Sequence, residues 1–256
     1  MRKQEELLFV FAILIGLFSS YLVSCSAYQS NLIDPSPTKT LPKDPMEVSL
    51  LTSDGIALKA NYYPSLNSDS KNKLLILLHG AYEDSTSWNG FRKTAQEAGF
   101  AVFTMDFRGH GQSDGEKTFD ASMDNDVEAA LDWLHTSLDV SEQQIALIGE
   151  SLGANLALRA GARHPGIPTV ILLSPGMSLW DIRIKEAIVD YGSRPLLMVA
   201  AEEDGYPAET VRQLDELAQG THKLLLLPGG QHGAEMIDTQ SNLANLMLTW
   251  LQETFP

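Results

Sequence analysis

The residues of this chain with the clearest chemical potential are centred on Ser151. It stands in the middle of Gly-Glu-Ser-Leu-Gly at 149–153, after an apolar run typical of a buried strand and before an apolar segment typical of a helix. A serine between a strand and a helix projects from a sharp, strained turn, and the flanking glycines leave room for the neighbouring backbone. A turn of small residues can show the same pattern, but this position predicts a nucleophile.

Two further polar side chains follow apolar runs later in the chain. Asp204 comes after the run at 196–201, and His232 follows four leucines at 224–227. Both are therefore expected beyond the carboxyl ends of strands, as Ser151 is. A serine hydroxyl is activated by a histidine that takes its proton and by an acid that orients the histidine. The other carboxylates that are candidates for the acid are Glu202, Glu203 and Asp181.

Two more motifs follow earlier apolar runs, His-Gly-Ala at 79–81 and Asp-Phe-Arg-Gly-His-Gly-Gln-Ser at 106–113. Together with the chain order of serine, acid and histidine, they make the chain from about Met46 to its C-terminus resemble the α/β-hydrolases. The resemblance implies Ser151 as nucleophile, Asp204 as acid and His232 as base, on a doubly wound, mostly parallel α/β sheet.

The resemblance also implies two backbone N–H donors for the negatively charged oxygen of the reaction intermediate. They correspond to Leu152, directly after the nucleophile, and Ala81, with Tyr82 as the alternative to Ala81. Loss of one such donor typically lowers the rate by about two to three orders of magnitude. His79 and Gly80 are expected to shape this turn rather than to react.

A charged cluster at Asp106, Arg108 and His110 also has the residue types of an active site. The corresponding stretch of the family is structural, so ion pairs and hydrogen bonds that fix its loop are expected. Glycine-containing segments at 109–114 and 115–118 lack glycines that dinucleotide and phosphate loops require. No cluster of His, Cys, Asp and Glu has the spacing of structural zinc ligands. We therefore expect neither a cofactor nor a metal ion.

The remaining pattern predicts the fold. An Asp-Gly turn at 53–55 joins two alternating segments and predicts an antiparallel hairpin at the sheet edge. Short apolar runs then alternate with helix-length segments, as in a parallel sheet that is covered on both faces. The strands are expected at 74–78, 101–104, 145–148, 170–173, 196–201 and 224–227, and the helices near 88–98, 124–136, 152–163, 208–218 and 235–251.

Lipases of this family insert a lid where this chain has only about twenty residues, 175–194. These are too few for more than a loop and one short helix, so little or no lid is expected. An open cleft suits short acyl groups or bulky leaving groups better than a long lipid tail. Side chains that line the cleft, or else pack on the body of the domain, are Tyr82, Met177, Trp180 and Tyr206.

The N-terminal segment has the features of a secretory signal. Arg2 and Lys3 precede an apolar run at 7–18, and Leu-Val-Ser-Cys follows at 22–25. These four residues resemble a bacterial lipobox, whose cysteine is lipidated and becomes the new N-terminus. Cys25 is the only cysteine in the chain, and lipidation would account for it. The alternative is an uncleaved membrane helix, because the segment is close to the roughly 17 residues that can span a bilayer.

The chain is thus divided into a signal peptide at 1–24, the lipidated Cys25 with a flexible, proline-containing tether to residue 45, and one catalytic domain at 46–256. A net charge of -15 without a basic stripe argues against a nucleic-acid partner. The expected partners are a small-molecule ester and, through the lipid anchor, a bacterial membrane, with the domain outside the cytoplasm. The sequence does not indicate an oligomeric state.

The sequence therefore predicts an exported, lipid-anchored serine hydrolase, a carboxylesterase that works through an acyl-enzyme. A thioesterase or a peptidase would use the same three residues. A binding lipoprotein on a hydrolase scaffold is the alternative from another class, because fold does not determine function.

Overall fold

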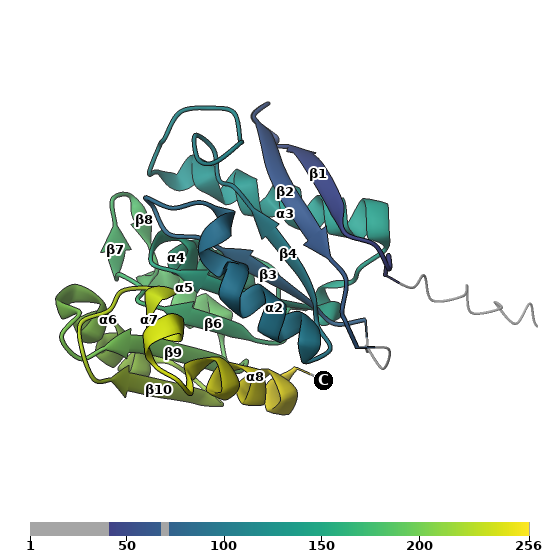
Figure 1. Ribbon diagram of the computed structural model, residues 1–256. Coiled ribbons are helices and arrows are strands. Elements are labelled where there is room, and N and C mark those ends of the chain that lie inside the picture. The colour runs from purple at the N-terminus through teal and green to yellow at the C-terminus, as the bar shows by residue number, and fades with distance from the viewer. Residues whose placement is uncertain (1–40, 68–71, 256) are drawn as a thin grey trace, which may run out of the picture. The chain divides into compact units, whose positions relative to one another are not determined.

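The computed structural model describes residues 41–67 and 72–255, and this part of the chain forms a mixed sheet with helices on both faces (Figure 1). The predictions for the signal peptide, Cys25 and most of the tether lie outside the described residues. None of the helices in the described segments has the length and apolar character needed to span a bilayer.

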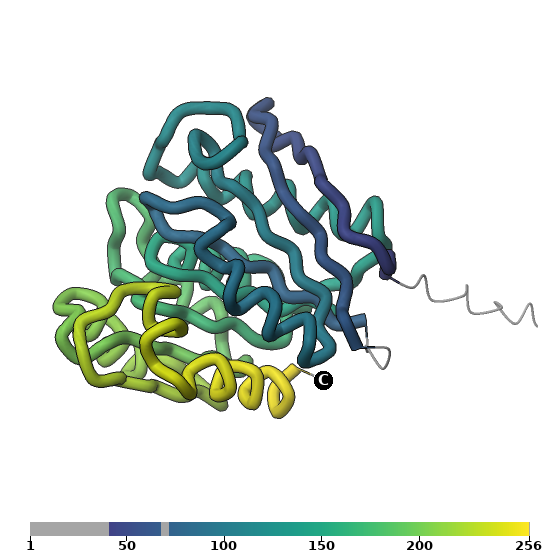
Figure 2. Tube along the Cα trace, viewed as in Figure 1, coloured from purple at the N-terminus to yellow at the C-terminus, as the bar shows by residue number. Residues whose placement is uncertain are grey.

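The sheet has eight strands within the described residues, in the spatial order β1-β2-β4-β3-β5-β6-β9-β10. Strand β2 runs antiparallel to both of its neighbours. The other six strands beyond it, β4, β3, β5, β6, β9 and β10, are parallel to one another. Figure 2 shows the β1–β2 hairpin at one edge and β10 at the other. The bounds are β1 Met46–Leu51, β2 Ala57–Tyr63, β3 Leu74–Leu78, β4 Ala101–Met105, β5 Ile145–Glu150, β6 Val170–Leu173, β9 Leu196–Ala201 and β10 His222–Leu227.

Burial explains why the two kinds of strand have different sequence patterns. All five residues of β3, Leu-Leu-Ile-Leu-Leu, are buried because helices cover both faces of the central sheet. In β1 and β2 buried and more exposed positions alternate, because only one face of the hairpin packs on the core. Gly55 has a φ of 87° in the turn that joins them, a conformation that glycine adopts without strain.

Helices cover the two faces of the sheet as separate layers. On one face α3, α4, α5 and α6 contribute to one apolar cluster, and on the other face α2, α7 and α8 contribute to a second. Their bounds are α2 Asn89–Glu97, α3 Asp124–Leu138, α4 Leu152–Arg163, α5 Lys185–Tyr191, α6 Gly205–Leu217, α7 Glu235–Thr239 and α8 Leu243–Thr254, with short 3-10 helices η1 Ser85–Trp88, η2 Ala121–Met123 and η3 Glu142–Gln144. The predicted fold class is confirmed.

Two segments differ from the sequence-based expectation. The helix expected at 235–251 is two helices, α7 and α8, separated at Gln240, whose side chain turns back to donate a hydrogen bond to the carbonyl of Pro228. The segment 175–194 contains the expected short helix α5, and also a two-stranded hairpin of β7, Ser178–Leu179, and β8, Ile182–Arg183. Two-residue strands have no periodicity to detect.

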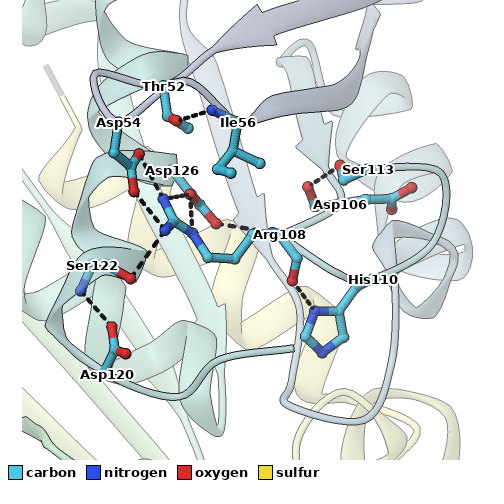
Figure 3. A network of polar contacts seen from close by, with 10 residues as sticks. All are labelled: Thr52, Asp54, Ile56, Asp106, Arg108, His110, Ser113, Asp120, Ser122 and Asp126. Atoms are coloured by element: carbon cyan, nitrogen blue, oxygen red, sulfur yellow. Dashed lines mark hydrogen bonds and ion pairs between the residues drawn. The ribbon is translucent and has the colours of Figure 1, made fainter. Parts of the chain in front are cut away.

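Arg108 is the centre of a buried ion-pair network, shown in Figure 3. Its guanidinium lies 2.7 Å from a carboxylate oxygen of Asp126 and 2.7 Å from one of Asp54, and it also donates to Ser122. The backbone N–H of Arg108 donates to Asp126 as well. The network ties the loop after β4 to the hairpin turn and to α3, as the structural interpretation of this charged cluster predicts.

Replacement of Arg108 with Leu should lower the free energy of unfolding by about 3 to 5 kcal/mol, because the fully buried carboxylate of Asp126 loses its partner. Denaturant unfolding measures the loss. Asp54→Ala is the matched control and should lower stability less, since the side chain of Asp54 is 37% exposed. An Arg108→Leu protein as stable as the wild type would show that the ion pairs do not hold the loop.

Candidate active site

Ser151 occupies a strained turn between β5 and α4. Its φ of 51° and ψ of −116° lie outside the regions that non-glycine residues normally adopt, and such strain concentrates at functional sites. The two glycines of the motif are required by packing. A Cβ on Gly149 would overlap the carbonyl oxygen of Gly153, and a Cβ on Gly153 would overlap that of Leu78.

Asp204 and His232 are hydrogen-bonded to each other. Nδ1 of His232 lies 2.8 Å from Oδ2 of Asp204, so the proton on Nδ1 is held by the carboxylate and Nε2 is left to accept another. Asp204 ends the turn before α6, and its side chain is 15% exposed, against 48% for His232. Of the four carboxylates considered from the sequence, Asp204 is the one that contacts the histidine.

The order of the strands separates the serine from the histidine. Ser151 follows β5 and His232 follows β10, and β6 and β9 lie between them. Three strand spacings of about 4.8 Å amount to roughly 14 Å, which no side chain contact can bridge. The loop after β10 must therefore return across the sheet toward the serine.

Three consecutive residues of that loop are held by the ends of three different strands. His232 binds Asp204, which follows β9. The N–H of Gly233 donates to Oγ of Ser174, which follows β6, at 3.0 Å. The N–H of Ala234 donates to Oε2 of Glu150, the last residue of β5, at 2.7 Å. We call residues 232–234 the histidine loop.

Ser174 was not identified from the sequence as a site residue. It is fully buried at the end of β6, and its hydroxyl donates to Oδ2 of Asp204 at 2.8 Å while accepting from Gly233. It therefore holds the acid and the histidine loop together. The available signal was a serine directly after a buried apolar strand, in line with Ser151 and Asp204.

The hydroxyl of Ser151 has no hydrogen-bond partner within the described residues, so no hydrogen bond joins it to His232 in this structure. Catalytic hydrogen bonds are often long before substrate binds and shorten in the complex. The loop that follows β3 passes directly beside the serine: a Cβ on Gly80 would lie 3.7 Å from Cβ of Ser151. The carbonyl group of a substrate would therefore meet this loop and the start of α4 together.

The expected oxyanion donors lie on these two elements. The N–H of Leu152 is in the first turn of α4, where N–H groups have no partner inside the helix. The N–H groups of Ala81 and Tyr82 take no part in the backbone hydrogen bonds of the described residues. Both elements therefore present free donors beside Ser151, the arrangement that stabilises a developing oxyanion.

Two buried histidines shape the loop after β3. Nε2 of His79 accepts from the N–H of Phe107 at 3.0 Å, so this nitrogen carries no proton. Burial lowers the pKa of His79 to about 4, which keeps the ring neutral. Nε2 of His110 lies 2.7 Å from the carbonyl oxygen of Ala81. Both histidines thus position the loop at 79–84, in agreement with the structural roles expected for them. We call it the oxyanion loop because it carries the expected donors of Ala81 and Tyr82.

Of the four side chains expected to line a cleft, Tyr82 and Trp180 come together around Phe119, which sequence reasoning missed. Trp180 stacks on Phe119 with ring centroids 4.2 Å apart, and Tyr82 meets both rings edge-on. Tyr82 and Trp180 are 79% and 47% exposed. The hydroxyl of Tyr206 accepts from the N–H of Ser178 at 2.9 Å and donates to its carbonyl at 3.3 Å, and Met177 packs against the core.

The fold and the site define the class of serine hydrolases with the α/β-hydrolase fold. The chain belongs to the family described as serine aminopeptidase, S33, whose model matches residues 69–203. Among curated proteins it is similar to the uncharacterized protein Rv2307c of Mycobacterium tuberculosis, at 26% identity over 223 residues, which are 80% of this chain and 78% of that protein.

Solved structures of low sequence identity establish the same fold. The esterase Pf2001 of Pyrococcus furiosus is similar with a TM-score of 0.71 at 19% identity, over 83% of this chain and 93% of that one. XC6422 of Xanthomonas campestris, described as a serine hydrolase without a lid, gives 0.67 at 17% over 85% and 98%. Est1E of Butyrivibrio proteoclasticus, solved with ferulic acid bound, gives 0.66 at 23% over 80% and 99%.

Replacement of Ser174 with Ala should slow phosphonylation of Ser151 by a fluorophosphonate about tenfold or more. Asp204 loses a hydrogen bond and Gly233 loses its acceptor, so His232 is held less firmly. Labelling kinetics on purified protein measure the effect. Ser49→Ala removes an exposed hydroxyl on β1 and should label at the wild-type rate. Equal rates for Ser174→Ala and the wild type would contradict the role of Ser174.

Proposed function

We propose that this protein is a carboxylesterase that cleaves its substrate through an acyl-enzyme formed on Ser151. The observation that carries the proposal is the hydrogen bond between His232 and Asp204 on a loop that returns toward a strained serine. Strain at a serine between a strand and a helix, together with an oriented histidine, is costly to maintain and serves nucleophilic catalysis.

In the proposed mechanism Oγ of Ser151 attacks the ester carbonyl carbon while Nε2 of His232 takes the hydroxyl proton. The N–H groups of Leu152 and Ala81 stabilise the oxyanion, and Asp204 stabilises the imidazolium. The imidazolium then protonates the departing alkoxide, which leaves an ester on Ser151. In the second half of the reaction His232 deprotonates a water molecule, which attacks the carbonyl carbon of the acyl-enzyme. The carboxylic acid is released and Ser151 regains its proton from the histidine.

The loops around the site favour a substrate with a short acyl group or a bulky, aromatic part. The segment between β6 and β9 contributes only the β7–β8 hairpin and α5, so it cannot enclose a long apolar chain. The exposed ring of Tyr82 stands on the loop after β3 and that of Trp180 on the turn of the β7–β8 hairpin, and an aromatic group would stack there. The ferulic acid bound by Est1E shows that this fold accommodates an aromatic acid in one neighbour.

Ser151→Ala should abolish labelling by a fluorophosphonate probe and lower the hydrolysis of p-nitrophenyl acetate by at least about 10³-fold. Gel fluorescence and absorbance at one protein concentration measure the two effects. Persistent labelling of the variant would overturn the assignment of Ser151. A wild-type protein that neither labels nor hydrolyses any ester would favour a binding protein.

The same assay separates the related activities. Acyl chains from two to sixteen carbons, acyl thioesters and aminoacyl p-nitroanilides are compared by kcat/KM on the wild-type protein. The proposal predicts the highest value for acetyl or butyryl esters, or for an aromatic ester. A preference for long acyl chains would contradict the proposed open site, and a preference for anilides would support the peptidase named in the family description.

We further propose that the protein is exported and anchored by a lipid on Cys25. Support comes from the basic and apolar N-terminal sequence that ends at the only cysteine. Cys25→Ala in a bacterial host should release the protein from the membrane fraction into the soluble fraction, or leave it as the larger, unprocessed precursor. Fractionation and immunoblotting measure both outcomes. Ser24→Ala, a neighbouring change that keeps the cysteine, should leave the distribution unchanged. Unchanged membrane association of Cys25→Ala would favour an uncleaved helix.

A further inference from the structure

Glu150 is a buried acid that the proposed chemistry does not use. It is the residue directly before the nucleophile, is 2% exposed, and ends the strand that carries the turn of Ser151. A carboxyl group is removed from water only at a considerable free-energy cost unless its environment compensates for it. Its contacts therefore indicate why it is placed there.

The carboxyl of Glu150 contacts the histidine loop, the 3-10 helix η1 and the loop after β3. Oε2 accepts from the N–H of Ala234 in the histidine loop, and Oε1 accepts from the hydroxyl of Ser87 in η1 at 2.7 Å. The carboxyl of Glu83, in the loop after β3, lies beside that of Glu150: a Cβ on Gly80 would be 3.6 Å from Oε2 of Glu83 and 3.7 Å from Cγ of Glu150. Gly233 also packs on Glu150 so closely that a Cβ there would lie 2.5 Å from Oε2 of Glu150.

The bond between Glu150 and Glu83 requires a proton, because two carboxylates can only repel each other. Burial, and next the hydrogen bond to Glu83, raise the pKa of Glu150 to about 8. Other titratable groups on the contacted segments include His232, whose ring turns to Asp204, and the buried His79, whose Nε2 accepts from the N–H of Phe107. Asp84, next to Glu83, is bonded to Thr86. Glu150 therefore carries the proton, which lies in its hydrogen bond to Glu83.

We propose that Glu150 is a positioning residue that, through a proton shared with Glu83, holds the oxyanion loop and the histidine loop in register around Ser151. When the proton is lost, the contact with the oxyanion loop becomes repulsive, and Glu83, which is exposed, turns to solvent. The contact with Ala234 remains. The proposal rests on the proposed hydrolase function, and it predicts a reversible loss of kcat at alkaline pH.

The test compares Glu150→Gln, Glu83→Gln and Glu97→Gln with the wild type. A glutamine at either position of the pair supplies a permanent N–H donor and a carbonyl acceptor, so the link persists without a shared proton. Glu97 is an exposed acid on α2, and Glu97→Gln makes the same change of charge away from the site. The kcat and KM of a short-chain ester are measured from pH 5 to pH 10.

In the wild type and Glu97→Gln, kcat should fall at least threefold between pH 7 and pH 9.5, with KM changed less than twofold. In Glu150→Gln and Glu83→Gln the fall should be absent or displaced by more than one pH unit. Glu83→Gln changes an exposed side chain and is expected to fold, so it keeps the test valid if Glu150→Gln does not. An identical alkaline fall in all four proteins would overturn the proposal.

A second readout does not depend on activity. Because the pKa of Glu150 is raised, the folded protein binds a proton that the unfolded chain has released, so stability falls as pH rises from about 4.5 to about 8. The Tm of Glu150→Gln relative to Glu97→Gln should therefore increase over this range. If the wild type is inactive but this difference appears, the hydrolase function fails and the proton-sharing pair stands. A constant Tm difference would overturn the pair itself.

Discussion

The spacing of parallel strands is the constraint on which the rest of this site depends. The candidate nucleophile and the candidate base follow β5 and β10, which are three strand positions apart. The sheet alone would leave them roughly 14 Å from each other. The loop after β10 must cover that distance, and it must then be fixed well enough for a proton to pass between two side chains.

The structure meets this constraint with one anchor at each of the two intervening strands and a third at β5, the strand of the nucleophile. His232, Gly233 and Ala234 are consecutive, and they bind groups at the ends of β9, β6 and β5 in turn. Two of the anchors use backbone N–H groups, so the path of the loop is specified by its backbone as well as by the histidine. Side chains held by packing and hydrogen bonds lose less freedom when substrate binds, which favours catalysis.

The oxyanion loop is fixed in a comparable way from the opposite side. His110 contacts the carbonyl of Ala81, His79 accepts from the loop after β4, and Arg108 ties that loop to Asp54 and Asp126. Glu150 lies between the two supported loops and contacts both. Buried polar networks of this kind stabilise one geometry only when each member is satisfied, and here the shared proton satisfies two acids at once.

The sequence predicted the elements whose signal is local. Strands β3, β6 and β9 and helix α4 have the bounds expected from apolar runs and from the glycines around Ser151. The hydrogen bond of Asp204 with His232 agrees with the order of the motifs along the chain. Ser174, Phe119 and the partners of Glu150 were not predicted, because their roles arise from contacts between residues distant in sequence. Apart from the place of Ser174 directly after a buried apolar strand, nothing within the local sequence distinguishes these residues from ordinary loop residues.

The most direct test of the central claim, that the histidine loop brings His232 to Ser151, is a crystal structure of the protein after reaction with a fluorophosphonate. The account predicts a phosphorus atom bonded to Oγ of Ser151, with one phosphoryl oxygen within about 3.1 Å of the N–H groups of Leu152 and Ala81. Nε2 of His232 should lie within about 3.2 Å of Oγ or of a phosphonate oxygen, with Asp204 still bonded to Nδ1. An adduct on another residue, or a histidine turned away from the phosphonate, would contradict it.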